Sequence, residues 1–306
     1  MQPLISVIGN IFMDVKGFAS HPYNPVGKNV GEVKLVHGGV GRNVAETLAS
    51  LGVPVRLVAT VDDNALGHEV LDRLRRSGVD TGYLPYFPRG MGMWLAILDE
   101  QGHLAGGISQ QPDFAGLMEL LERHGSEIAE WSSHIVLSID LTEEIARKAI
   151  ALARAAGKPV FGLPGNFQVV AAYPDLLIGL DCFICNHVEA GRLLEVEFGD
   201  LPRDRQLEEL VRYVHDRSLR SMVVTLGADG SVYYDAVSEL KGHQPVFPVE
   251  MVDSSGAGDA FFAGTVTGLV RGLPLDQAVV WGTKVAGLVV ASAENNCADL
   301  GVRLGV

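Results

Sequence analysis

The sequence predicts an α/β fold in which helices cover a central, mostly parallel β-sheet. Four short apolar runs each end in polar residues or glycine: HIVLSID (134–140), PVFGLPG (159–165), DCFICN (181–186) and SMVVTLG (221–227). Segments with helical periodicity separate most of these runs. Apolar strands that alternate with helices are typical of parallel sheets, because a parallel strand needs a crossover connection to reach the next one.

The clearest crossover helix is predicted over residues 142–157. It begins with Thr142 as a capping residue, repeats apolar residues at helical spacing and stops at Gly157. Nearer the N-terminus, ISVIG (5–9) and VRLVAT (55–60) are predicted strands, with a helix over VGRNVAETLASLG (40–52) between them. The sheet is therefore expected to begin at the N-terminus.

Two stretches, about 12–37 and 90–110, do not follow this alternation. The second contains two apolar strands on either side of the turn DEQG (99–102). We expect both stretches to form a small β-sheet that leaves the main layer and acts as a lid over one edge of it. Because no internal repeat divides the chain, residues 1–306 are expected to form a single domain with this inserted lid.

Composition argues against several classes of function. The formal net charge of −13 opposes binding to a nucleic acid polymer, which depends on clustered Lys and Arg. The sequence lacks both an apolar segment long enough to span a membrane and a signal peptide, so we expect a cytoplasmic protein. Cys182 and Cys185 form a CxxC pair in a predicted strand, where residues three apart point to opposite faces. This geometry argues against a disulfide or a shared metal.

The stretch DSSGAGD (253–259) is the strongest candidate site. It lies between the extended run VFPVEMVD (246–253) and an apolar helix predicted over AFFAGTVTGLVRG (260–272). Small residues at the start of a helix let backbone amides approach a ligand, and the helix N-terminus adds partial positive charge. The sequence therefore predicts a site for an anion at this junction.

Four residues of this stretch are the candidate catalytic groups. The amides of Gly256, Ala257 and Gly258 would surround the anion. A carboxylate beside that anion, as Asp259 would be, suits proton transfer or metal binding. The alternative is that Asp259 only complements the helix dipole.

DSSGAGD resembles the signature of the pfkB family of carbohydrate and nucleoside kinases. Three further motifs stand in that family's order: GGVGRN (38–43), NHVE (186–189) and TLGADG (225–230). The resemblance extends over nearly the whole chain. It implies a ribokinase-like three-layer fold with a small β-sheet lid, and an ATP-dependent kinase that phosphorylates the primary hydroxyl of a ribose-like sugar or nucleoside.

The resemblance also implies roles for individual residues on the substrate side. Asp259 corresponds to the catalytic base of the family, and Asp253 and Ser255 correspond to residues that help to hold a monovalent cation such as K⁺. The substrate contacts correspond to Asp14, Gly39 and Asn43, where Asp14 would accept hydrogen bonds from a vicinal diol. Phe12 stands where relatives often carry Asn.

On the nucleotide side, Thr225, Gly227 and Gly230 correspond to residues that hold the phosphates and ribose of ATP. Asn186 and Glu189 follow a predicted strand, where an amide and a carboxylate can order Mg²⁺-bound water around these phosphates. The same two residues could instead form a capping box at the start of a helix.

The substrate and the class of protein have alternatives. Residues 27–52 and ENN (294–296) are most similar to the pseudouridine kinase branch, while ribose and other nucleosides stay open as substrates. The resemblance further implies a homodimer that pairs through the lid strands. A nucleoside sensor without turnover would need no base such as Asp259. A dinucleotide-dependent oxidoreductase is disfavoured because Val44 replaces the third glycine of its phosphate-binding loop.

Overall fold

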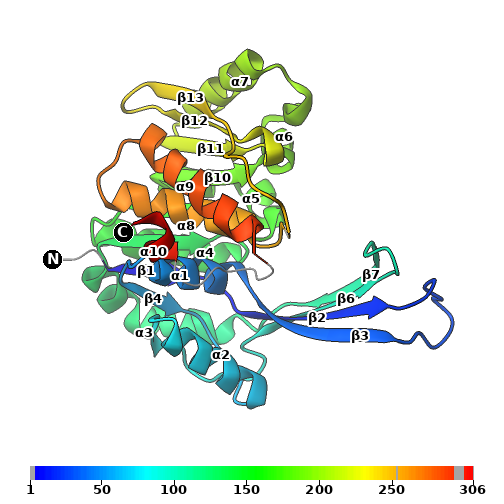
Figure 1. The fold of residues 1–306 in the computed structure, drawn as a ribbon. Helices are drawn as coiled ribbons and strands as arrows, with labels where there is room; N and C mark the ends of the chain where they lie inside the picture. The colour runs from blue at the N-terminus through cyan, green and yellow to red at the C-terminus, as the bar shows by residue number, and fades with distance from the viewer. Residues whose placement is uncertain (1–3, 253, 293–299, 306) are drawn as a thin grey trace.

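A nine-stranded β-sheet forms the centre of the molecule in the computed structural model, which describes residues 4–252, 254–292 and 300–305 (Figure 1). In sheet order, its strands are β13 (Leu240–Gln244), β12 (Ser231–Asp235), β11 (Ser221–Thr225), β10 (Cys182–Asn186), β9 (Val160–Leu163), β8 (His134–Ser138), β1 (Ile5–Ile8), β4 (Val55–Val58) and β5 (Asp80–Tyr83). From β11 to β5 all neighbours pair in parallel, and β12 and β13 add an antiparallel edge. The predicted mostly parallel sheet is therefore confirmed.

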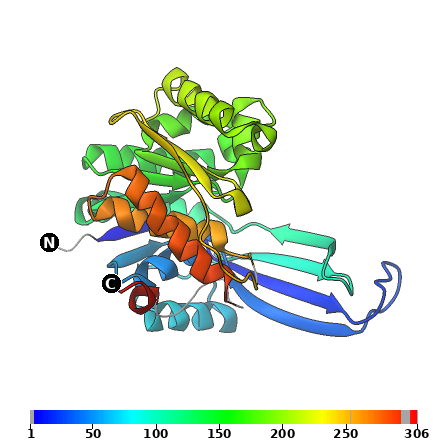
Figure 2. The same cartoon turned by 45° about the horizontal axis from the view of Figure 1, so that its top comes forward.

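Helices cover both faces of this sheet (Figure 2). Apolar side chains of α1, α2, α8 and α9 pack on one face, and those of α3 to α7 pack on the other. The three layers confirm the predicted α/β fold. The helices are α1 (Val40–Ser50), α2 (Ala65–Arg76), α3 (Ala115–Trp131), α4 (Glu143–Ala155), α5 (Phe167–Ala172), α6 (His187–Leu194), α7 (Arg203–Asp216), α8 (Ala257–Val270), α9 (Leu275–Val290) and α10 (Leu300–Leu304).

The central strands are buried on both faces, which explains why they appear in the sequence as continuous apolar runs. Cys182 and Cys185 illustrate this arrangement, because both are buried in β10 but pack into the hydrophobic cores on opposite sides of the sheet. Among the described residues, no helix is both long and apolar enough to cross a lipid bilayer.

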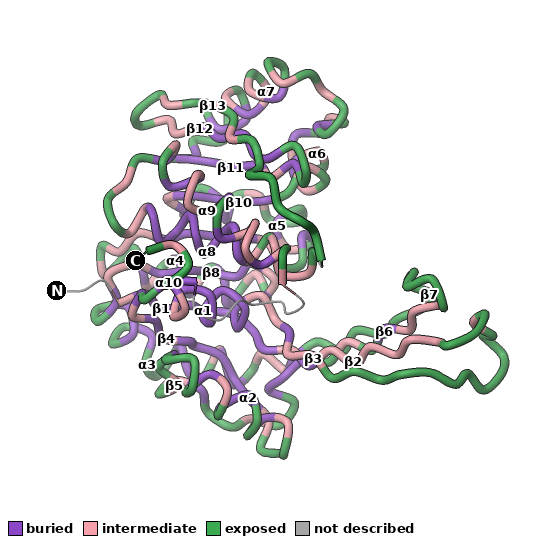
Figure 3. The backbone as a smooth tube through the Cα atoms, viewed as in Figure 1, coloured by how far each residue is buried: buried purple, intermediate pink, exposed green. Residues whose placement is uncertain are grey.

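A second sheet of four strands projects from one side of this body (Figure 1). This outer sheet has the order β3 (Gly31–Gly38), β2 (Phe12–Ala19), β6 (Gly92–Leu98) and β7 (Leu104–Gln110). β6 and β7 form the antiparallel pair expected around DEQG, and β2 pairs in parallel with β6. Most residues of the outer sheet are exposed or half-buried, and burial increases toward the body (Figure 3).

The topology argues against a dinucleotide-binding loop at GGVGRN. Such a loop follows a strand of the central parallel sheet and leads into a helix. Here the strand before the motif is β3, which belongs to the outer sheet, and only the helix α1 follows as expected.

The approach to α8 differs from the expectation in two respects. Residues 246–252 belong to no strand of either sheet, and Val252 donates its N–H to Val290 O at 2.9 Å. Pro245 and Pro248 have no N–H to give to a ladder, which explains why this extended run stays unpaired. In addition, α8 begins at Ala257 rather than Ala260, directly after Gly256, whose φ is +76°.

A close contact with α9 fixes the position of α8. A Cβ atom at Gly282 on α9 would lie 2.6 Å from Phe261 O and 2.2 Å from Thr265 Oγ1, both on α8. Thr265 donates its hydroxyl to the same carbonyl oxygen at 2.9 Å. Only glycine at position 282 therefore lets the two helices approach this closely.

This contact predicts that Gly282→Ala changes the stability of the fold in the opposite direction to most Gly→Ala substitutions in helices. In most helices Gly→Ala is stabilising by about 0.5–1 kcal/mol. We expect Gly282→Ala to destabilise the fold by about 1–3 kcal/mol instead, because the methyl group overpacks the backbone of α8. Urea unfolding measures the difference. Gly106→Ala is the control, since a Cβ atom there meets nothing within 4 Å. Equal or increased stability of Gly282→Ala would contradict the packing described here.

Candidate active site

The carboxyl ends of the parallel strands gather the polar residues of the site along one edge of the large sheet. Asn10 follows β1 and Asp140 follows β8, while Asn186 and Thr225 are the last residues of β10 and β11. Ligands of open α/β sheets bind along this edge. Three strand spacings separate β10 from β1, which corresponds to about 14 Å. The edge is therefore long enough for two groups of side chains with different tasks.

The residues that were predicted to form an anion hole and to supply a base lie at the N-terminus of α8. Gly256 has the left-handed conformation that allows the chain to turn into the helix, and Asp259 lies in the first turn. The N–H of Ala257 donates to Ser254 O at 3.2 Å, so one of the three amides expected to face an anion already has an acceptor. Ser255 lies in the loop before α8, and Asp253 lies outside the described residues.

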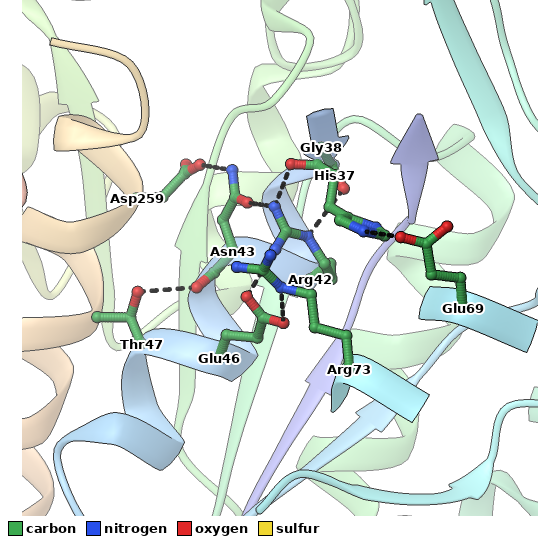
Figure 4. A network of polar contacts seen from close by, with 9 residues as sticks. All are labelled: His37, Gly38, Arg42, Asn43, Glu46, Thr47, Glu69, Arg73 and Asp259. Carbon is green, nitrogen blue, oxygen red and sulfur yellow. Dashed lines mark hydrogen bonds and ion pairs between the residues drawn. The ribbon is translucent and has the colours of Figure 1, made fainter. Parts of the chain in front are cut away.

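Asp259 is held by an amide from the opposite end of the chain. The Nδ2 atom of Asn43, on α1, donates to Asp259 Oδ2 at 2.7 Å (Figure 4). The resemblance implied that Asn43 contacts the substrate; in the structure its side chain contacts Asp259, the predicted base. Since α1 packs on α8, two motifs that are 216 residues apart in sequence meet at one carboxylate.

The surroundings of Asp259 raise the pKa of its carboxyl group to about 6. Burial is the main cause, since it disfavours the charged form, and repulsion by Asp140 acts in the same direction. The hydrogen bond from Asn43 and the charge of Arg42 oppose this shift. At neutral pH the carboxylate is therefore ionised but accepts a proton more readily than an ordinary aspartate, which suits a general base.

Asn10, Ser138 and Asp140 form a polar cluster that the sequence interpretation missed. Asn10 Nδ2 donates to Asp140 Oδ2, and Ser138 Oγ donates to Asp140 Oδ1 at 2.7 Å. The Oδ1 atom of Asn10 is buried without a hydrogen-bond partner among the described residues. Burial raises the pKa of Asp140. An acid at the end of the run HIVLSID was the available signal, since polar residues at this edge often bind ligands.

Asp14 reaches the site from the outer sheet. It lies on β2 opposite Val36 of β3, and its carboxylate would come within 2.9 Å of a Cβ atom at Gly38. Burial raises the pKa of Asp14, while Lys16 and Arg42 oppose the shift.

The backbone at Gly39 adapts the start of α1 to this crowded region. Gly39 has a φ of +95°, and a Cβ atom there would lie 2.8 Å from Asn10 O and Phe12 N. Glycine is therefore required by the backbone at this position, whether or not a substrate binds beside it.

Asn186 and Glu189 form the capping box that the sequence left open as an alternative. The N–H of Glu189 donates to Asn186 Oδ1, and the N–H of Asn186 donates to Glu189 Oε2, both at 2.9 Å. Burial raises the pKa of Glu189. A carboxylate offers about four acceptor positions, so the capping bond leaves room for other hydrogen bonds.

The loop after β11 contains the remaining predicted nucleotide contacts. Thr225 donates its hydroxyl to Cys185 O at 3.4 Å, and Gly227 and Gly230 both have positive φ. A Cβ atom at Gly230 would lie 2.0 Å from Gln244 O on β13. Packing therefore requires glycine at this position, whether or not a nucleotide binds there. The loop places backbone groups beside the start of α6 at the same edge of the sheet.

The donor atoms near β10 fit a magnesium ion that is held mainly through water. Carboxylate and amide oxygens are hard ligands that suit Mg²⁺, which keeps several of its waters in proteins. Among the described residues, no cluster of three or more His, Cys, Asp or Glu side chains could bind a metal directly. Asn186 and Glu189 are therefore suited to contact ordered water rather than to enclose an ion.

Comparison with known proteins gives a consistent result for sequence and fold. A model described as "pfkB family carbohydrate kinase" matches residues 2–297. The chain is 35% identical to a guanosine-inosine kinase of Exiguobacterium acetylicum, covering 95% of each protein. It is 28% identical to a pseudouridine kinase of Escherichia coli, covering 97% of this chain and 94% of the relative.

The most informative solved structures are ribokinases, which show the fold alone because their sequences are distant. A ribokinase of Arabidopsis thaliana complexed with ribose and ATP has a TM-score of 0.85 at 20% identity, covering 99% of this chain and 98% of the other. A ribokinase of Giardia lamblia has a TM-score of 0.86 at 16% identity, covering 100% and 98%. The expected ribokinase-like fold is therefore confirmed.

The raised pKa of Asp259 predicts that its removal stabilises the protein. A carboxyl group that titrates near 6 in the folded state and near 3.8 when unfolded destabilises the fold as pH rises from about 4 to about 6. Asp259→Asn removes this penalty, so we expect it to stabilise the fold above pH 6 by up to about 3 kcal/mol. Thermal unfolding at pH 4 and pH 8 tests the sign. The stabilisation should be present at pH 8 and absent at pH 4; a loss of stability at pH 8 would contradict the buried charge.

Proposed function

Because the chain belongs to the pfkB family of carbohydrate kinases, whose members transfer phosphoryl groups to an alcohol acceptor, we propose that it transfers the γ-phosphoryl group of ATP to the 5′-hydroxyl of a ribonucleoside. The observation that carries this proposal is the Asp259 carboxylate. It lies in the first turn of α8, is hydrogen-bonded to Asn43 and has a pKa raised to about 6.

In this reaction Asp259 accepts the proton of the substrate hydroxyl as its oxygen attacks the γ-phosphorus atom of ATP, and the bond from that phosphorus to the bridging oxygen breaks to release ADP. The start of α8 offers backbone N–H groups and the positive end of the helix dipole to the charge on the transferring group. We assign this role to Gly256, Ala257 and Gly258, with the N–H of Ala257 exchanging its present acceptor, Ser254 O.

Acceptor groups for the sugar lie beside the base. Asp14 and Asp140 are carboxylates whose pKa values are raised by burial, so each gains from a hydroxyl donor that enters the site. Gly39 and Asn43 complete this side, together with Asn10, whose Oδ1 atom has no hydrogen-bond partner in the described part of the chain. The outer sheet would close over the substrate as a lid and exclude water, which otherwise competes as the acceptor.

The nucleotide is proposed to lie over the ends of β10 and β11, with contacts to Thr225, Gly227 and Gly230. Asn186 and Glu189 would hold a hydrated Mg²⁺ ion, which neutralises charge on the phosphates of ATP. Ser255 and Asp253 are proposed to contribute to a site for a monovalent cation such as K⁺. The enzyme is proposed to act in the cytoplasm.

Two nucleoside classes are the leading substrates. A purine nucleoside such as guanosine or inosine is supported by the relative that is 35% identical. Pseudouridine is supported by the relative that is 28% identical and by the similarity of residues 27–52, and it is the second candidate. Ribose itself is the third, since relatives at 24% identity include a ribokinase.

A homodimer through the outer sheet is supported by an apolar row that crosses all four strands. Leu35, Val15, Leu95 and Ile108 are cross-strand partners in this order, and Leu35 and Ile108 are 58% and 69% exposed. Exposed apolar rows of this kind mark interaction surfaces. We propose that the same row of a second copy covers it.

Turnover tests the proposed reaction. ADP formation is measured with Mg²⁺ and K⁺ across guanosine, inosine, pseudouridine, uridine, adenosine and ribose. We expect turnover of at least one nucleoside, and we expect Asp259→Asn to reduce it by about 10²–10⁴ because the base is lost. Asp216→Asn on the exposed part of α7 is the control with unchanged turnover. ATP binding without turnover of any acceptor would favour a sensor, and wild-type turnover by Asp259→Asn would remove the base from the mechanism.

The state of association tests the dimer. Analytical ultracentrifugation should give twice the mass of the chain, and Ile108→Lys should shift the protein to monomer, because it places a charge in the apolar row. Val237→Lys changes a similarly exposed residue between β12 and β13 and should leave the mass unchanged. A monomeric wild-type protein at micromolar concentration would refute the dimer.

A further inference from the structure

A buried arginine contacts Asn43, the residue that is hydrogen-bonded to Asp259. Arg42, on α1, is 1% exposed and forms a salt bridge with Glu46, which is 0% exposed, at 2.6 Å. Glu46 also pairs with Arg73 of α2 at 2.9 Å. On its other side Arg42 Nη2 donates to Asn43 Oδ1, so the contacts run without a break from Arg73 to Asp259 (Figure 4). The sequence motif GGVGRN by itself did not predict a role for Arg42.

The chemistry of the guanidinium group fixes the orientation of Asn43. A guanidinium group only donates hydrogen bonds, so the atom of the Asn43 amide that faces Arg42 must be the oxygen. The amide nitrogen must then face Asp259, where it can only donate. Asp259 Oδ2 is thereby kept as an acceptor, and the Asn43 side chain cannot turn without leaving a buried donor facing another donor.

We propose that Arg42 is a positioning residue for the phosphoryl-transfer reaction, which acts through Asn43 to orient the carboxylate of Asp259 and to keep it ionised. This inference rests on the proposed function. Arg42 touches neither substrate nor nucleotide in this role, and its effect on the base combines a fixed hydrogen-bond direction with a nearby positive charge.

The charges around Asp259 act on its pKa in opposite directions. Arg42 on α1 attracts the Asp259 carboxylate, whereas Asp140, after β8, repels it. Glu46 partly cancels the charge of Arg42, and Arg73 and Asp14 also act on the guanidinium group. Removing the charge of Arg42 and removing that of Glu46 should therefore move the pKa of Asp259 in opposite directions.

Arg42 also ties the outer sheet to the base. Its Nε donates to Gly38 O at 3.1 Å, and its Nη2 donates to His37 O. Both carbonyl groups lie at the end of β3, directly before the backbone of Gly39. The same guanidinium group thus positions the substrate side of the lid and the amide that holds the base.

The test is the pH dependence of kcat/KM, which reports the ionisation of the free enzyme. The wild-type profile should fall below a pH of about 6, where Asp259 becomes protonated. Arg42→Met should raise this midpoint by roughly one pH unit and reduce kcat/KM at pH 6 by roughly fivefold, because an attractive charge is lost. Glu46→Gln should lower the midpoint, because the charge of Arg42 is no longer offset.

Glu46→Gln also keeps the test usable if Arg42→Met fails to fold. Its side chain keeps the shape of Glu46, and its amide oxygen can still accept from Arg42 while its nitrogen faces Arg73, which is partly exposed and can turn to water. The double variant Arg42→Met/Glu46→Gln removes the buried carboxylate that the single Arg42 variant leaves with Arg73 as its ion-pair partner. Arg147→Met, on the exposed face of α4, is the control whose midpoint should not move.

Opposite shifts of the midpoint support the positioning role. If both variants lower kcat/KM equally at every pH, or shift the midpoint in the same direction, Arg42 only stabilises the fold and the proposal is wrong. Asp259→Asn separates this failure from failure of the proposed function: an inactive Asp259→Asn with unmoved midpoints rejects Arg42 alone, whereas an active Asp259→Asn rejects the base itself.

Discussion

The hydrogen bond between Asn43 and Asp259 is the contact on which the candidate site depends. It requires that α1 and α8 pack side by side and that both begin at the edge where the parallel strands end. Glycines at the helix starts and at the α8–α9 contact allow this approach, since Gly39 and Gly282 lie against backbone atoms of other segments. The large sheet supplies the edge, and the two helices bring Asp259, the proposed base, and Asn43 together.

The site concentrates negative charge around one buried cation. Burial raises the pKa values of Asp14, Asp140 and Asp259 together, and Arg42 is the positive group that acts on both Asp14 and Asp259. Buried carboxylates are costly unless hydrogen-bond donors satisfy them. A polyhydroxylated ligand brings such donors. The buried carboxylates therefore destabilise the free protein but favour binding of the ligand.

Much of the fold could be predicted from the sequence because strands buried on both faces are visible as short apolar runs. Asp259 could be placed because a helix start rich in small residues is a local feature. Arg42 and Asp140 could not be placed, since their roles arise from contacts between segments far apart in the chain. Asn186 and Glu189 show a different limit: one spacing fits both a capping box and a metal-water site, and the capping box is the part that local geometry determines.

The pairing of Arg42 with Glu46 has a consequence for how the chain is made. The two residues are one helical turn apart, so they can meet as soon as α1 forms, whereas Asp259 is synthesised more than two hundred residues later. Domains generally fold as units, and α1 packs on α8, which is made in the last part of the chain. The Arg42–Glu46 pair can therefore form early in synthesis, but its full burial has to wait until α8 has left the ribosome.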